Sequence, residues 1–214
     1  MKKLLMFAGI VLLITSCVGI KSTVSFNRDG SGVIQFEYRI SKMITELSSQ
    51  SGDKKAEAPL PISEEELRGA LANHPDLKLK KVTQREDERD VYITAEIEFA
   101  KIDEFTSVKS FNAMPMSLEK KGNEYIFRQY ISKGESGGEG KEGENAEPDE
   151  ATKQMMASFF EGYELSFTVN SPSAITYNNL GEVSPDKKSL SYSIPLLELN
   201  SLKQETVLEV RWKT

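Results

Sequence analysis

Two residue types with distinctive chemistry occur once each in the 214-residue chain, as Cys17 and His74. A lone cysteine cannot form a disulfide within one chain, so an internal structural disulfide is excluded. One histidine excludes a histidine-rich metal site, and a zinc site would then rest on carboxylates, which is unusual for that metal. His74 lies in the helix-ending context Asn-His-Pro-Asp, which favours a capping or exposed histidine over a catalytic one. The sequence therefore predicts no metal-binding and no cofactor-binding residue.

The chain also lacks the motifs of common hydrolases. The patterns Gly-x-Ser-x-Gly and Gly-x-Gly-x-x-Gly occur once each, at 134–138 and 138–143, but inside an acidic glycine-rich segment and not at an elbow between a strand and a helix. No Ser-x-x-Lys has suitable partners. Carboxylate pairs such as Glu96 and Glu98 fall on one face of an expected strand, where solvation explains them best. We therefore expect no catalytic residue and no enzymatic activity. The alternative, an unrecognised hydrolase, requires a cleft in which titratable groups of perturbed pKa converge.

The first residues have the parts of a secretory signal. A basic Met-Lys-Lys start is followed by an apolar stretch over residues 4–14 and by the small residues Thr15 and Ser16. The apolar stretch is too short for a transmembrane helix, which needs roughly 20 residues. We expect residues 1–16 to be a signal peptide that is removed on export.

The segment 14–17, Ile-Thr-Ser-Cys, resembles the bacterial lipobox. That resemblance implies diacylglycerol on the Cys17 thiol, cleavage before Cys17 and acylation of the new amino terminus. Two or three acyl chains anchor a protein stably, so no second membrane segment is needed. The alternative is a plain secreted protein whose signal contains a cysteine. Because Val18 stands where aspartate signals inner-membrane retention in some bacteria, an outer-membrane anchor is favoured, with the domain in the periplasm or on the cell surface.

The net charge argues against a nucleic-acid partner. Removal of residues 1–16 takes two lysines from the 27 basic side chains and leaves 25 against 33 acidic ones, a formal charge of −8. A field of that sign repels nucleic acids and anionic head groups. The excess charge is explained most simply as keeping an exported domain soluble.

Alternating apolar residues predict strands at both ends of the chain. Val24 and Phe26 alternate with polar neighbours, as do the apolar residues of 34–38, and the intervening segment 27–32 contains the Asp and Gly residues of a tight turn. Residues 91–99 form a further stripe with a period of two residues, and 206–213 a last one. A β-hairpin directly after the anchor is therefore expected.

Helical patterns are shorter. They cover 41–49, a segment starting at Ser63 with capping-box residues, a turn at 102–108, and 151–161. With seven to nine expected strands, the inventory predicts an α+β fold with a largely antiparallel sheet and three or four short helices.

Residues 134–150 differ in composition from the rest of the chain. They contain five glycines, seven acidic residues and one lysine, and they offer nothing to bury. We expect a flexible acidic loop here, within a single domain that covers residues 17–214.

Segments near both ends resemble the LppM-domain lipoproteins of bacterial envelopes. The likeness consists of the hairpin loop at 26–32, the strand and turn at 163–172, the segment 189–192, and Val-Arg-Trp at 210–212. It implies an α+β domain with a curved sheet and an apolar cavity, proposed for that family to bind lipid or glycolipid. The chain departs from the family in lacking a C-terminal transmembrane helix and in carrying the acidic insertion, and no family binding residue can be transferred.

We therefore expect a non-enzymatic envelope lipoprotein anchored through Cys17, with a pocket for a lipid-like or apolar ligand. The alternative is a tethered interaction module that binds another envelope protein and no small molecule. An exposed apolar patch over a filled core would favour that alternative.

Overall fold

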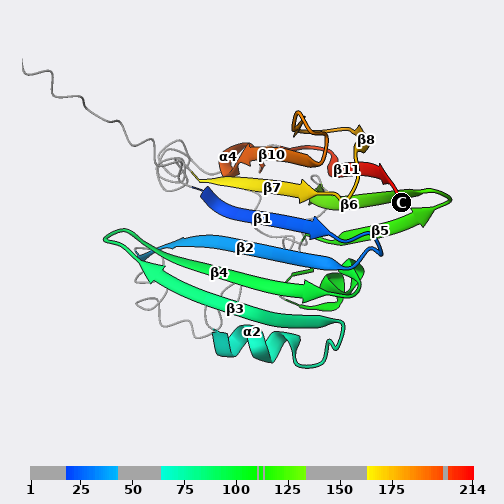
Figure 1. Cartoon of the computed structure of the whole chain (residues 1–214). Coiled ribbons are helices and arrows are strands. Elements are labelled where there is room, and N and C mark those ends of the chain that lie inside the picture. Colours follow the sequence, from blue (N-terminus) through cyan, green and yellow to red (C-terminus); the bar gives the residue numbers. More distant parts are fainter. Residues whose placement is uncertain (1–17, 43–63, 110, 113, 134–162, 200–201) are drawn as a thin grey trace, which may run out of the picture.

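The computed structural model describes eleven strands that form two sheets (Figure 1). The described residues are 18–42, 64–109, 111–112, 114–133, 163–199 and 202–214. The seven-stranded sheet has the order β3-β4-β2-β1-β7-β10-β9. Its strands are β1 (Val18–Phe26), β2 (Gly32–Ser41), β3 (Leu77–Glu86), β4 (Asp90–Phe99), β7 (Glu164–Asn170), β9 (Glu182–Val183) and β10 (Ser189–Pro195).

The second sheet has four strands in the order β5-β6-β11-β8. They are β5 (Met116–Lys121), β6 (Glu124–Lys133), β8 (Ile175–Asn178) and β11 (Glu205–Lys213). Every strand pair in the two sheets is antiparallel except β1 and β7, which run parallel. The expectation of largely antiparallel pairing is confirmed. The expectation of one sheet is wrong, because alternation identifies the buried face of each strand and not its partners.

The β1–β2 hairpin confirms the turn expected at 27–32, and its glycines have separate roles. Gly30 has a φ of +89°, in the left-handed region that favours glycine. Gly32 has no room for a side chain, since a Cβ there would lie 2.1 Å from the Ser25 carbonyl oxygen. Asp29 accepts hydrogen bonds from the backbone N–H and the hydroxyl of Ser31, which closes the turn. β1 itself starts at Val18, earlier than the alternation indicates.

The two sheets share one apolar core. The ring of Phe26 on β1 lies 5.0 Å from Trp212 on β11 and 5.2 Å from Phe127 on β6, centroid to centroid. Trp212 and Phe127 are 0% and 1% exposed. The inward faces of both sheets therefore pack against each other, as in a sandwich.

The described part of the chain contains fewer helices than expected. The described residues contain α2 (Glu64–Leu71), the 3-10 turn η1 (Ile102–Ser107) and the single turn α4 (Leu196–Leu199). In α2 the side chains of Leu67 and Leu71 are buried, as its pattern predicts. The count of three or four short helices is too high for this part of the chain, where the segment at 102–108 forms the 3-10 turn η1 and not an α-helix. The helix expected at 151–161 and the loop at 134–150 lie outside the described residues, as does the helix expected at 41–49 except for its first two residues, of which Ser41 ends β2.

Candidate functional site

A small apolar cavity lies on the inward side of β1 and β2, and its volume is about 40 Å³. The β1–β2 hairpin, the connection between η1 and β5, the first residue of β5, and strands β6 and β7 all contribute to its lining. Its apolar wall consists of Ile20, Phe36, Phe111, Met114, Met116 and Phe167.

Two hydroxyl groups in this cavity have no hydrogen-bond partner among the residues that the structure describes. They are Ser22 Oγ and Tyr38 Oη, on residues that are only 3% and 4% exposed. A buried hydroxyl without a partner costs about 1–3 kcal/mol. Most buried polar groups are satisfied, so two orphaned hydroxyls in one apolar cavity require an explanation.

The third polar group of the cavity is engaged. The side-chain amide of Gln129 on β6 donates to the Met114 carbonyl oxygen at 2.9 Å, and this holds the residues before β5 against the cavity. Phe36 and Phe111 stack with ring centroids 5.1 Å apart, which closes another side. The wall is thus fixed by contacts from several strands.

The cavity is electrically neutral over its described lining. None of the lining residues named above carries a charged side chain. Burial, and to a smaller extent the Glu66 carboxylate, raises the pKa of the Tyr38 phenol well above its ordinary value. Tyr38 therefore stays protonated over the physiological pH range and offers a neutral O–H donor.

The cavity lies close in sequence to the expected lipid attachment site. Cys17 itself is outside the described residues, but β1 begins at Val18 and Ile20 lines the cavity. At roughly 3.3 Å per residue of strand, Ile20 is within about 10 Å of Cys17. A lipid on Cys17 would hold this end of the hairpin next to a membrane.

A buried ion pair lies on the outward face of the larger sheet, at the end where β1 begins. Asp90 on β4 accepts a hydrogen bond from Arg39 on β2 and a second, of 2.9 Å, from the Tyr163 hydroxyl. The two charged side chains are 6% and 2% exposed. The guanidinium also lies over the rings of Tyr163 and Tyr92, at 4.7 Å and 5.7 Å. This cluster ties β2, β4 and the start of β7 together.

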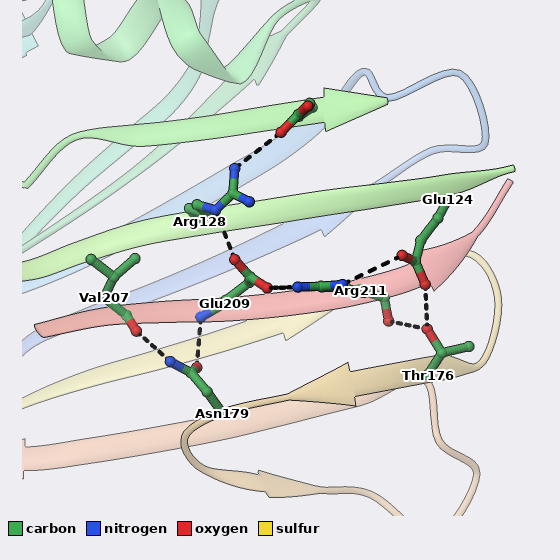
Figure 2. Close-up of polar contacts among 8 residues, drawn as sticks. Glu124, Arg128, Thr176, Asn179, Val207, Glu209 and Arg211 are labelled. Carbon is green, nitrogen blue, oxygen red and sulfur yellow. Dashed lines mark hydrogen bonds and ion pairs between the residues drawn. The ribbon is translucent and has the colours of Figure 1, made fainter. Parts of the chain in front are cut away.

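The outward face of the smaller sheet carries a charged ladder (Figure 2). Arg128 donates to Glu209 at 2.8 Å, and Arg211 donates to the same carboxylate at 2.8 Å. Arg211 also lies 3.9 Å from Glu124. Burial raises the pKa of Glu209, but the bonds from both arginines outweigh burial and hold it below its ordinary value. Both arginines are engaged with carboxylates, so the ladder is better suited to joining strands than to binding an anion.

A polar groove of about 610 Å³ runs over the outward side of β7 and β10. Hydroxyls of Ser166, Thr168 and Ser191 line it together with the Lys21 side chain. Its described lining contains no buried polar atom without a partner. The groove therefore gives no comparable indication of a missing ligand.

The single histidine and the carboxylate pair noted in the sequence make structural contacts. The Nδ1 atom of His74 lies 2.7 Å from the Glu104 carboxylate, so the half-buried histidine joins the end of α2 to η1. Glu98 pairs with Lys80 at 3.0 Å, and Glu96 accepts from Gln35 at 3.0 Å. Within the described residues no three His, Cys, Asp or Glu side chains are grouped as a metal would require.

In the part of the chain that the structure describes, no helix is long and apolar enough to cross a bilayer.

Comparison with protein families found no matching family model, and no curated protein matches. Among solved structures, the chain is similar to the folded domain of LppM from Mycobacterium tuberculosis, determined by NMR. The identity is 12% and the TM-score 0.44, over 92% of this chain and 89% of that one. The likeness brings no ligand or activity to this chain.

The sequence reasoning missed the residues of the cavity. Ser22, Tyr38 and Gln129 each stand in an otherwise apolar inward stripe, on β1, β2 and β6. Such residues could have been found in the sequence as polar residues that interrupt an apolar stripe. The apolar residues two positions before and after them predict that they are buried. Which of these residues meet in one cavity depends on the strand pairing, which the stripes do not contain.

Proposed function

We propose that the protein is a non-enzymatic lipoprotein of the bacterial cell envelope, anchored through Cys17, that binds an apolar or lipid-like ligand between its sheets. The observation that carries the ligand is the apolar cavity with the orphaned hydroxyls of Ser22 and Tyr38. An amphiphile would fill apolar space and offer an oxygen to these donors, which removes the cost of burying them unpaired. At about 40 Å³ the cavity admits a small part of such a ligand, so a whole acyl chain requires its walls to move apart.

The anchor is tested at Cys17. Replacement Cys17→Ala removes the only thiol in the chain, so the protein is expected to move to the soluble fraction or to stay as an uncleaved precursor. Cell fractionation and metabolic labelling with a fatty-acid analogue measure both outcomes. Ser22→Ala, which keeps the thiol, serves as the control and should stay in the membrane fraction. Unchanged lipid labelling of the Cys17→Ala variant would contradict the anchor.

The cavity is tested by filling it. Ser22→Ile places an apolar, strand-compatible side chain in the cavity, and we expect about tenfold less co-purified lipid, the equivalent of about 1.4 kcal/mol. Native mass spectrometry after extraction in mild detergent measures the lipid. The matched control is Thr23→Ile, because Thr23 is the next residue of β1 and faces outward. Equal lipid content in both variants, or none in the wild-type protein, would refute ligand binding at this cavity.

The second candidate function, a tethered protein-interaction module, needs an exposed apolar patch. Over the described surface the only large hydrophobic residue that is strongly exposed is Tyr177, at 46%. Its ring lies under the Arg211 guanidinium at 4.7 Å, which accounts for its position. This observation favours the ligand cavity over the interaction module.

A further inference from the structure

We propose that the cavity selects a neutral acyl ester of the surrounding membrane, a diacylglycerol, and that Ser22 and Tyr38 donate hydrogen bonds to its ester carbonyl. The inference rests on the proposed function, because it names the ligand class of the same cavity. It is carried by the two orphaned donors, by the absence of charge in the described lining, and by the place of the cavity on β1.

The two hydroxyls are placed to act on one group. In the β1–β2 register Ile20 is opposite Tyr38 and Ser22 is opposite Phe36, so Ser22 and Tyr38 are diagonal neighbours on adjacent strands. Both side chains line the same cavity. A carbonyl oxygen has two lone pairs and can accept from both hydroxyls at once. The rest of the cavity wall is apolar and suits the methylene groups beside the ester.

The charges around the cavity oppose an anionic ligand. The Glu66 carboxylate acts on the Tyr38 phenol, which places a negative charge near the donor. Arg39, the next residue after Tyr38, belongs to the outward face and is held by Asp90. Lys42 pairs with Glu86 at 3.2 Å. A fatty-acid carboxylate in the cavity would therefore lose its water and meet no cation among the described lining residues. Burial of an unpaired charge in this way is costly.

The position of the cavity indicates the source of the ligand. Ile20 lines the cavity and is three residues from Cys17, so the lipidated protein holds the cavity near the head-group region, where the esters of membrane lipids lie. At about 40 Å³ the cavity has room for little more than the ester carbonyl, while the acyl chains stay outside it.

The experiment uses the full lipoprotein in phosphatidylcholine vesicles that contain either photoactivatable diacylglycerol or a photoactivatable fatty acid with the same reactive group. Crosslinked peptides are identified by mass spectrometry. Only the added probe can label, so acyl chains on Cys17 itself are not counted. We expect diacylglycerol to label the peptides of Phe36 and Phe167 more strongly than the fatty acid does. Tyr38→Phe and Ser22→Ala should each lower this labelling about three- to tenfold, through loss of one hydrogen bond.

Matched variants separate the cavity from the surface. Tyr177→Phe removes an exposed phenol hydroxyl, and Ser191→Ala removes an exposed serine hydroxyl. Both should label as strongly as the wild-type protein. Since Ser22 Oγ and Tyr38 Oη have no hydrogen-bond partner in the described part of the chain, the two cavity variants should fold with unchanged or higher melting temperature.

The outcomes distinguish the inference from the proposed function. Equal labelling by both probes, or labelling that Tyr38→Phe and Ser22→Ala leave unchanged, keeps the apolar cavity as a binding site and overturns the ester assignment. Stronger labelling by the fatty acid also overturns it. Absence of cavity labelling by either probe overturns both the inference and binding of a membrane ligand.

Discussion

Asp90→Ala is expected to lower the free energy of unfolding by about 3–5 kcal/mol, the usual cost of breaking a buried ion pair from one side. The Arg39 guanidinium would remain in a site where its side chain is only 6% exposed, without the carboxylate that faces it. The Tyr163 hydroxyl would lose its 2.9 Å acceptor as well. Urea or guanidinium unfolding of the purified protein measures the change.

Two further variants test the reason for that loss. Asp90→Asn keeps the size of the side chain and an acceptor oxygen, so it should cost less than alanine. Replacement of both partners, Arg39→Met with Asp90→Leu, removes both charges and should recover most of the stability. If the double variant is no more stable than Asp90→Ala, lost packing and not the lost pairing of Asp90 with Arg39 causes the change. A change below about 1 kcal/mol in Asp90→Ala would contradict a buried pair altogether.

The location of this ion pair connects stability with the proposed anchor. Arg39 is on β2 opposite Tyr92, next to the pair formed by Tyr38 and Ile20, so the cluster lies at the end of the sheet where β1 begins. Glu164, the residue after Tyr163, is opposite Val18 in the parallel β1–β7 pair. A tether at Cys17 would transmit any pull from the membrane to this end, and the cluster joins three strands there.

Much of the local structure could be predicted from the sequence because it depends on near neighbours. The hairpin turn at 27–32, the start of α2 after Ser63 and the stripe of β4 each arise from residues a few positions apart. The division into two sheets could not be predicted, since it depends on pairs such as Val24 with Val169 and Trp212 with Tyr125. Such long-range pairs are selected by packing, which no local pattern records.

The residues that form the cavity are even harder to predict from the sequence than the pairing of the strands. Its hydroxyls come from β1 and β2, its amide from β6, and its methionines from the segment before β5 and from the first residue of β5. Sequence alternation places Tyr38 inward with Ile34 and Phe36, and this is correct. It does not show that the Tyr38 hydroxyl ends without a partner, because that depends on what every neighbouring strand presents. By contrast, the lipid site at Cys17 could be proposed from the sequence, since export signals are read from the unfolded chain.

Trp212→Ala is expected to cost about 3–5 kcal/mol, the range for removal of a large buried aromatic side chain. Trp212 is fully buried on β11, and its ring lies 5.0 Å from Phe26 on β1 and 5.8 Å from Tyr125 on β6. Its loss opens a cavity where the two sheets meet, so the effect should reach both. Thermal unfolding, monitored by the far-UV circular dichroism of the backbone because the variant lacks the tryptophan, measures the change. Tyr177→Ala, on the exposed side of β8, is the control.

A milder change separates packing from hydrogen bonding. The Trp212 Nε1 atom is buried without a hydrogen-bond partner among the described residues, so Trp212→Phe removes an unsatisfied N–H as well as ring area. Its cost should therefore be clearly smaller than that of alanine. A double-mutant cycle with Phe26→Leu should show coupling of about 0.5–3 kcal/mol, as residues in contact do. Additive effects, or a Trp212→Ala loss no larger than that of Tyr177→Ala, would mean that the sheets do not depend on this contact. Coupling would mean that β1, which forms part of the cavity wall, and the smaller sheet depend on the contact between Phe26 and Trp212. A ligand that separates the sheets would then have to overcome this contact.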